Sequence, residues 1–400
     1  MQRHQLFVTI STFLLFAFYS FQSVEAQIDP DSKAFVAAVD SIFADKADMK
    51  SPGASVIVMK GKEIILSRSY GSANLAFETP FNKNTVFPLS NFTDQLVAFS
   101  ILQLEKKKRI KLSDRVNKYL PELGFQNDIS ISHILNHSSD LPVIGSVRLM
   151  AGWNFTDPFS HNDFLNLTKA VAGNLKPDTS IQHNHTGMKI LLMLVEKVSE
   201  MPFSEYAAAN IFRPLDMTSS FIQTEDSEEN RNSSIGYNQT DAGLQRTHTM
   251  EMGLMCPMTY STRYDFEKWM LNIQTKKIGG SIIEKMDQAL SLKGEPQARE
   301  NRAYCIGQQQ YFKFWGEGKF YILDVHEGYS WEWARLPQSG ISIMAIGNVS
   351  TYIGNKVNAI AGLLVPYASN SSTAEIAEPL AIKMSEKELQ AYTGFYWDNG

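Results

Sequence analysis

The chain has 400 residues, of which 44% are apolar and 20% charged, a balance typical of a globular protein and not of a disordered one. Its formal net charge is −5 and its pI is about 5.9, so no excess of positive charge favours nucleic acid or an anionic membrane as a partner. The two cysteines, Cys256 and Cys305, leave open one disulfide or two buried free thiols, and they are too few for a zinc site built on cysteine.

The first 26 residues differ in character from the rest. A basic start precedes an apolar stretch from Leu6 to Tyr19, which is shorter than the ~20 residues that a membrane span needs. Val24-Glu25-Ala26 then has the small-x-small pattern of a cleavage site. We interpret residues 1–26 as a secretory signal peptide, with an uncleaved membrane anchor as the alternative. The sequence therefore predicts a secreted or periplasmic protein with no transmembrane segment after cleavage.

Strands are expected near both ends of the remaining chain. Residues 54–59 and 63–70 are β-rich runs separated by a short turn, and they predict a hairpin. Residues 320–325, 329–335 and 340–346 repeat the pattern close to the other end. A sheet that joins these two distant regions would hold the chain together from both sides.

The middle of the chain is mostly helical. Residues 92–105 carry apolar groups on one helix face, and residues 187–199 are too apolar for a surface helix. Strands at both ends with helices between them predict an α+β fold, in which one antiparallel sheet packs against helices and carries a mostly helical insertion. We place the main domain at residues 27–365 and interpret residues 366–400 as a linker and the start of a C-terminal β domain.

Several segments, in the same order along the chain, resemble those of one known family. They are SPGASVIVMKGKEIILSRSYGSANL, KLSDRVNKYLPEL, ISISHILNHSSDLP, KPDTSIQHNHTGMKILLMLVEKVSEM and LPQSGISIMAIGN. This order is similar to that of the β-lactamase-related serine hydrolases, the group of class C β-lactamases, penicillin-binding proteins, D-alanyl-D-alanine carboxypeptidases and related esterases. The resemblance runs from about Ser51 to Val365 and implies the β-lactamase/transpeptidase-like fold, with a site at the start of the central helix.

The first motif of this family is changed. Relatives carry Ser-x-x-Lys at the start of the central helix, where a lysine one turn beyond the serine can take its proton. Alignment on Phe87-Pro88 places Asn91 at the serine position and Asp94 at the lysine position. We interpret these two residues as capping residues of the helix start. Ser90 is the nearby hydroxyl, but Thr93 stands three residues after it, so this register lacks a base too.

The second and third motifs are changed as well. The resemblance places His183 and His185 at the positions of Tyr-x-Asn, whose tyrosine shuttles protons beside the serine. Histidine can carry protons near neutral pH, but without a nucleophile it has no serine to serve. For the third motif, His/Lys-x-Gly, the candidates are His326 and Gly328, although the glycine-rich loop that normally follows is missing.

Four histidines raise the alternative of a metal site: His133, His137, His183 and His185. Relatives carry histidines at the first two of these positions without a metal. No carboxylate falls at the spacing of a metal motif. We therefore expect no metal and no cofactor.

With three motifs changed, the sequence predicts a catalytically inactive member, a pseudoenzyme. Loss of a covalent nucleophile typically costs about a millionfold in rate. We expect its cleft to bind a small molecule, a peptide, a cell-wall fragment or a partner protein, and no nucleic acid. The alternative is an active serine-type hydrolase, either an esterase, a D-Ala-D-Ala peptidase or a β-lactamase-like enzyme, that uses His183 together with either Ser90 or a bound water. The oligomeric state does not follow from the sequence.

Overall fold

The computed structural model of the protein describes residues 29–30, 32–154, 157–171, 173, 175–224, 232–247, 257–292, 295–296, 302–314, 317–326 and 328–365. The predicted signal peptide and the predicted C-terminal segment lie outside these residues. Cys256 also lies outside them, whereas Cys305 is buried and carries a free thiol. Among the described residues, none of the helices has the length and apolar character that crossing a membrane requires.

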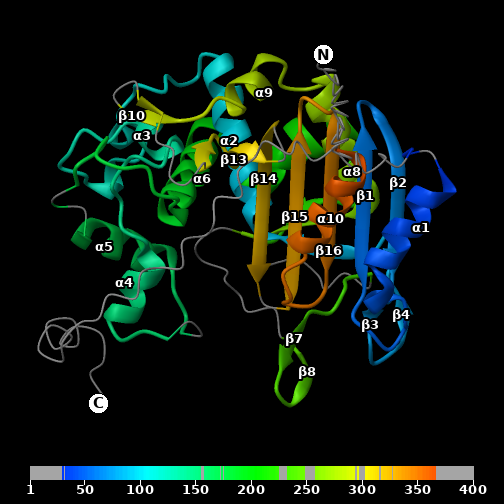
Figure 1. Ribbon diagram of the computed structural model, residues 1–400. Coiled ribbons are helices and arrows are strands. Elements are labelled where there is room, and N and C mark those ends of the chain that lie inside the picture. Colours follow the sequence, from blue (N-terminus) through cyan, green and yellow to red (C-terminus); the bar gives the residue numbers. More distant parts are fainter. Residues whose placement is uncertain are drawn as a thin grey trace, which may run out of the picture.

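An antiparallel sheet of seven described strands forms the centre of the structure (Figure 1). In chain order its strands are β1 (Ala54–Lys60), β2 (Glu63–Tyr70), β12 (Arg302–Cys305), β13 (Gln308–Phe314), β14 (Glu317–His326), β15 (Tyr329–Leu336) and β16 (Ile341–Gly347). Their order across the sheet is β12-β13-β14-β15-β16-β1-β2. The predicted hairpin and the three predicted C-terminal strands are therefore confirmed, and β1 joins the two groups by pairing with β16.

Short strands extend the fold beyond this sheet. They are β3 (Ser72–Asn74) paired with β4 (Thr79–Pro80), β5 (Val86–Leu89) and β6 (Phe221–Ile222) on either side of β9 (Thr259–Thr262), β7 (Tyr237–Thr240) paired with β8 (Gly243–Arg246), and β10 (Ser291–Leu292) paired with β11 (Glu295–Pro296). The β7–β8 hairpin projects below the sheet in Figure 1. Strand β5 leads directly into the central helix, α2 (Ser90–Lys106).

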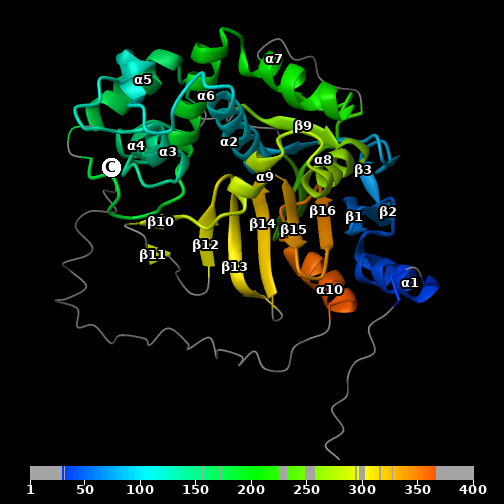
Figure 2. The same cartoon turned by 90° about the horizontal axis from the view of Figure 1, so that it is seen from above.

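The helices lie on both faces of the large sheet. They are α1 (Lys33–Ile42), α2 (Ser90–Lys106), α3 (Ile131–Leu135), α4 (Ile144–Met150), α5 (His161–Val171), α6 (His185–Ser199), α7 (Phe203–Ala207), α8 (Arg263–Thr275), α9 (Ser281–Met286) and α10 (Gly354–Leu364). Helices α1 and α10 cover one face, and α2, α8 and α9 cover the other (Figure 2). Helices α3 to α6 form a mostly helical region beside α2. The predicted α+β fold with a helical insertion is confirmed.

Strand β1 shows why the central strands are apolar throughout. Successive side chains of a strand point to opposite faces of the sheet. Ile57 and Met59 pack into the core that contains α2, whereas Val56 and Val58 pack into the second core with α1 and α10. Because helices cover both faces, neither set of side chains meets water, and a polar alternation would be unfavourable.

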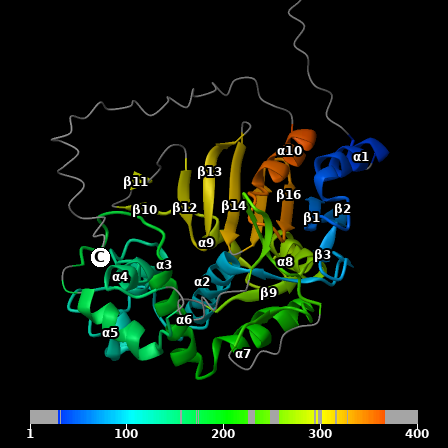
Figure 3. The same ribbon diagram turned by 90° about the horizontal axis from the view of Figure 1, so that it is seen from below.

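Helix α2 runs through the larger core, between the sheet and α6 (Figure 3). The side chain of Trp269, which lies on α8, fixes the position of α2. This indole lies edge-on to Phe92 and Phe99, with ring centroids 5.5 and 5.6 Å apart. Its Nε1–H also donates to Gln95 Oε1 at 3.0 Å. These contacts on successive turns set the rotation of α2, and with it the direction of the side chains in its first turn.

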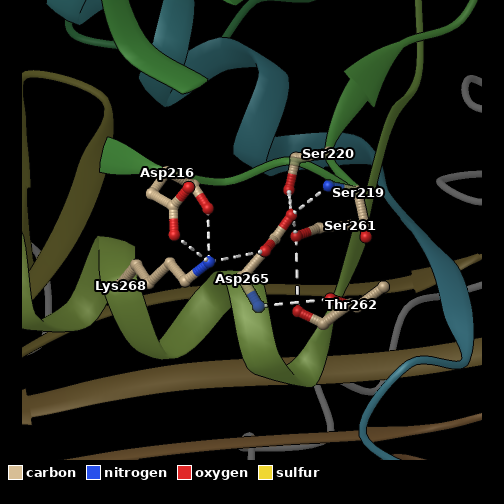
Figure 4. A network of polar contacts seen from close by, with 7 residues as sticks. All are labelled: Asp216, Ser219, Ser220, Ser261, Thr262, Asp265 and Lys268. Atoms are coloured by element: carbon tan, nitrogen blue, oxygen red, sulfur yellow. Dashed lines mark hydrogen bonds and ion pairs between the residues drawn. The ribbon is translucent and has the colours of Figure 1, made fainter. Parts of the chain in front are cut away.

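A polar network holds the start of α8, and therefore Trp269, in place (Figure 4). Thr262 caps the helix, because its hydroxyl accepts from the Asp265 N–H at 3.1 Å. The buried carboxylate of Asp265 accepts from the Ser219 N–H at 2.7 Å and from the Ser220 hydroxyl at 2.9 Å. Lys268 Nζ lies 3.4 Å from the same carboxylate. The network ties α8 to the segment that leads into β6.

This network predicts a large difference between two aspartates. Asp265→Ala removes a buried acceptor from the buried Ser220 hydroxyl, from the Ser219 N–H and from Lys268, and we expect it to lower the free energy of unfolding by about 3–5 kcal/mol. Asp216→Asn removes an exposed charge from the same Lys268 and should cost at most about 1 kcal/mol. Asparagine is the control substitution because Asp216 has φ 61°, a conformation that asparagine tolerates. Urea unfolding measures both; equal losses would contradict the assignment.

Candidate functional site

The first turn of α2 carries Asn91 and Asp94, but neither caps the helix. The N-cap residue is Leu89, and no side chain makes a capping hydrogen bond there. Asn91 Nδ2 instead donates to the Leu323 carbonyl of β14 at 2.7 Å. Asp94 is 5% exposed and turns toward the start of α6. The predicted capping role is therefore wrong, because partners on β14 and α6 hold both side chains away from the helix end.

His183 and His185 reach Asp94 from the start of α6. Asn184 between them is the N-cap residue, and its Oδ1 accepts from the Thr186 N–H at 2.8 Å. Its backbone is extended, with φ −149° and ψ 108°. Residues on either side of an extended residue point the same way. Both imidazoles accordingly face one carboxylate oxygen.

The distances at that oxygen are short. His183 Nε2 lies 3.4 Å and His185 Nδ1 3.2 Å from Asp94 Oδ2. The two imidazole rings are perpendicular, with centroids 4.6 Å apart. Three residues that the family resemblance placed at motif positions are thus brought together in space.

Burial and charge act in opposite directions on these groups. Burial alone would raise the pKa of Asp94, but its interactions with His183 and His185 outweigh this and lower the pKa. Burial would likewise lower the pKa of His185, yet the neighbouring Asp94 carboxylate raises it. The carboxylate of Asp94 is therefore ionised at neutral pH, and its negative charge favours the protonated form of His185.

His137 stands beside this group without joining it. Its ring centroid is 4.9 Å from that of His183. Burial, with a smaller contribution from the charge of His183, lowers the pKa of His137 to about 3. His137 is therefore a neutral imidazole at physiological pH.

A pocket opens in front of Asn91 and Asp94. It contains about 380 Å³ of empty space, part of it open to solvent. Its lining residues are Asn91, Asp94, His137, His183, Met188, Tyr304, Gly307, Gln308, Gln309, Tyr321, Ile322 and Leu323. The Tyr304 ring of β12 lies nearly parallel to the His183 ring, with an interplanar angle of 17°. The pocket thus combines a carboxylate and imidazoles with aromatic walls.

Strand β14 borders the pocket, but not through the residues expected for the third motif. Its lining residues are 321–323, while His326 at the strand end pairs with Tyr329 across the hairpin. Gly328 packs against β7, where an added Cβ would lie 2.5 Å from the Tyr237 nitrogen. His326 and Gly328 are not among the pocket-lining residues.

Asp324 was not anticipated from the sequence. The Ser90 hydroxyl donates to its carboxylate, and burial raises the pKa of Asp324 to about 6. Ser90 and Asp324 do not line the pocket. The raised pKa of Asp324 results from burial in the folded protein, so it could not be predicted from the neighbouring residues in the sequence.

The four histidines of the alternative metal site separate into two groups. His133 belongs to the capping box of α3 with Ser130, and its Nε2 lies 3.3 Å from Asp178 Oδ2. It does not line the pocket. His137, which follows α3, and His183, which precedes α6, both line the pocket. His133 therefore has a local structural role.

Comparison with known proteins agrees with this fold. The sequence model described as Beta-lactamase matches residues 39–357. Penicillin-binding protein 4* of Bacillus subtilis is 26% identical over 186 residues, which cover 45% of this chain and 40% of that protein. Protein flp of Staphylococcus aureus strain N315 is 25% identical over 273 residues, which cover 64% of this chain and 52% of that protein. The chain thus spans about half the length of these curated relatives, or less.

Solved structures share the architecture at low identity. The octameric penicillin-binding protein homologue from Pyrococcus abyssi superposes with a TM-score of 0.70 at 20% identity, over 83% of this chain and 76% of that chain. The D-amino acid amidase from Ochrobactrum anthropi superposes with a TM-score of 0.68 at 16% identity, over 84% and 98% of the two chains. At such identities the likeness establishes the fold.

The raised pKa of Asp324 predicts a pH-dependent effect of Asp324→Asn. A carboxyl whose folded pKa is raised adds stability at low pH, and this contribution is lost as the pH rises through the folded value, here about 6. Asparagine stays neutral and can still accept from Ser90. We therefore expect the variant to gain about 1 kcal/mol relative to wild type between pH 5 and pH 8.

Urea unfolding of both proteins at the two pH values measures this change. A stability difference that is the same at pH 5 and pH 8 would show that Asp324 does not titrate in this range.

Proposed function

The chain belongs to the Beta-lactamase family, and we propose that it is a member without the acyl-transfer chemistry of a nucleophilic serine. It is a pseudoenzyme in that sense, whose pocket binds its ligand without a covalent step. One observation carries the proposal. Within the described part of the chain, the pocket is lined by no serine, threonine, cysteine or lysine.

The groups at the two motif positions support this proposal. An acyl transfer needs a nucleophile and, within hydrogen-bond reach, a base that takes its proton. The amide of Asn91 is held by the Leu323 carbonyl. The carboxylate of Asp94 faces two imidazoles. The hydroxyl groups in the pocket lining are those of tyrosines, so Asp94 has no serine or threonine hydroxyl there to deprotonate. Tyr321 donates its hydroxyl to Gln309 at 2.8 Å.

We further propose a peptide or cell-wall fragment with a D-amino acid as the ligand, and a place outside the cytoplasm. Similar proteins include penicillin-binding proteins and a D-amino acid amidase. The aromatic and amide side chains of the lining suit a peptide, since they offer both apolar contact and hydrogen bonds. The expected signal peptide at residues 1–26 supports the location.

The proposal predicts that the protein forms no acyl adduct. The full chain is incubated with a fluorescent penicillin and with a p-nitrophenyl ester, and intact mass is measured alongside turnover. We expect unchanged mass and turnover no greater than that of the Ser90→Ala variant. A penicillin adduct on wild type that disappears when one pocket residue is replaced would falsify the proposal.

A second variant tests whether only the reactive groups differ from those of the relatives. The fourfold change Asn91→Ser, Asp94→Lys, His183→Tyr and His185→Asn restores the family motifs at the positions that the resemblance assigns. We expect this variant, if its circular dichroism matches wild type, to form the adduct that wild type lacks. Its failure to react while folded would mean that the pocket no longer accommodates a β-lactam.

A second candidate function follows from the pair Ser90 and Asp324. The hydrogen bond between them resembles that of a nucleophile and its base, and the pKa of Asp324 near 6 suits general-base work. Ser90 and Asp324 are not among the residues that line the pocket, however, which places the hydroxyl away from the proposed ligand site. Labelling of wild type by a fluorophosphonate that is abolished in Ser90→Ala but kept in Asn91→Ala would favour this candidate.

A further inference from the structure

Asp94, His183 and His185 offer three metal-ligating atoms on one side of the pocket. One carboxylate oxygen and one nitrogen from each imidazole all lie within 4.8 Å of one another. From this arrangement we propose that the three residues bind a divalent transition-metal ion, for which Zn²⁺ is the best match. The site takes the place of the serine-dependent groups of the relatives.

The distances fit a shared ion. Zinc binds nitrogen and oxygen ligands at roughly 2.0–2.2 Å in tetrahedral geometry, so two of its ligand atoms stand about 3.3–3.5 Å apart. Asp94 Oδ2 is 3.4 Å from His183 Nε2 and 3.2 Å from His185 Nδ1. The two oxygen–nitrogen separations therefore already match those of a tetrahedral ion, and the two nitrogens lie within 4.8 Å of each other.

The carboxylate oxygen lacks another partner. Asp94 is 5% exposed, and its Oδ2 is buried without a hydrogen-bond donor in suitable geometry among the described residues. A buried charge that receives no hydrogen bond in suitable geometry is unfavourable, even with the imidazoles of His183 and His185 3.4 and 3.2 Å away. A cation placed between the oxygen and the two nitrogens would remove this cost.

Hydrogen bonds anchor the backbone segments that carry the three ligands. The Trp269–Gln95 hydrogen bond fixes α2 one residue beyond Asp94. The Asn184 cap orders the backbone between the two histidines at the start of α6, and its Nδ2 also donates to the Leu141 carbonyl. Preorganised ligands lose little conformational entropy on binding, which favours affinity.

The donor set selects the class of ion. Two imidazoles and one carboxylate suit zinc and its neighbours in the first transition row, whereas Ca²⁺ and Mg²⁺ prefer oxygen ligands. Three protein ligands also leave a fourth position open. Because Asp94 and His183 line the pocket, a carboxylate or carbonyl of a bound peptide is the class of ligand that this position would receive.

Metal affinity of the full chain tests the inference. Protein stripped with EDTA is titrated with Zn²⁺ by calorimetry and with Co²⁺ by visible absorption, and the same titrations are run on Asp94→Asn, His183→Ala and His185→Ala. Since loss of even an outer partner of a zinc ligand costs about 10–100-fold in affinity, each variant should bind at least tenfold more weakly than wild type. His161→Ala is the matched control, because His161 is an exposed histidine at the start of α5.

We expect one Zn²⁺ per chain, an intense visible Co²⁺ spectrum typical of tetrahedral ligation, and wild-type binding in His161→Ala. The inference is overturned if wild type binds no Zn²⁺ at micromolar concentration. It is equally overturned if the three site variants, folded by circular dichroism, bind Zn²⁺ as wild type does.

The inference rests on the proposed function, since Asp94 can bind a metal ion only if it takes no part in acyl transfer. The metal site and the loss of serine chemistry can nevertheless fail separately. A penicillin adduct on a chain that still binds Zn²⁺ through these residues contradicts only the loss of serine chemistry. Absence of both Zn²⁺ binding and adduct contradicts only the metal site.

Discussion

The buried negative charge of Asp94 is the constraint on which the site depends. A carboxylate in the middle of an apolar core is stable only if positive charge or hydrogen-bond donors compensate for the water it has lost. Here the compensation comes from α6, whose first residue and the residue two before it both face Oδ2. The start of α6 must therefore stay close to the start of α2, and the pocket between α2, α6 and β14 keeps its shape for the same reason.

The rest of the fold holds that geometry. Helix α2 lies between the sheet and α6, and Trp269 locks its rotation through Phe92, Phe99 and Gln95. The Asp265 network fixes Trp269 in turn (Figure 4). Because packed cores transmit strain instead of absorbing it, a change on α8 would reach the pocket through α2. Stability and site geometry are thus connected in this protein.

Sequence alone predicted the framework better than the site. The strands near both ends, the central helix and the buried helix at 187–199 followed from apolar periodicity. The resemblance also put Asp94, His183 and His185 at motif positions of one cleft. Two features escaped prediction. Asn91 and Asp94 match a local capping pattern, yet their partners come from β14 and α6, and tertiary contacts prevailed over the local preference. Asp324 acquires its raised pKa from burial, which spacing along the chain does not encode.

The changes at the motif positions are coupled by charge. In the alignment on Phe87-Pro88, which the resemblance suggests, relatives have a lysine cation where this chain has the Asp94 anion, and the sign of the charge at this point of α2 is reversed. A buried aspartate at this position would be unfavourable beside a tyrosine and an asparagine, because neither side chain supplies positive charge. His183 and His185 can supply positive charge themselves, or they can bind a cation together with Asp94. Conversely, a lysine beside two imidazoles would be repelled whenever either is protonated. The charge of residue 94 and the charges of the two residues flanking Asn184 therefore affect the stability of the site together.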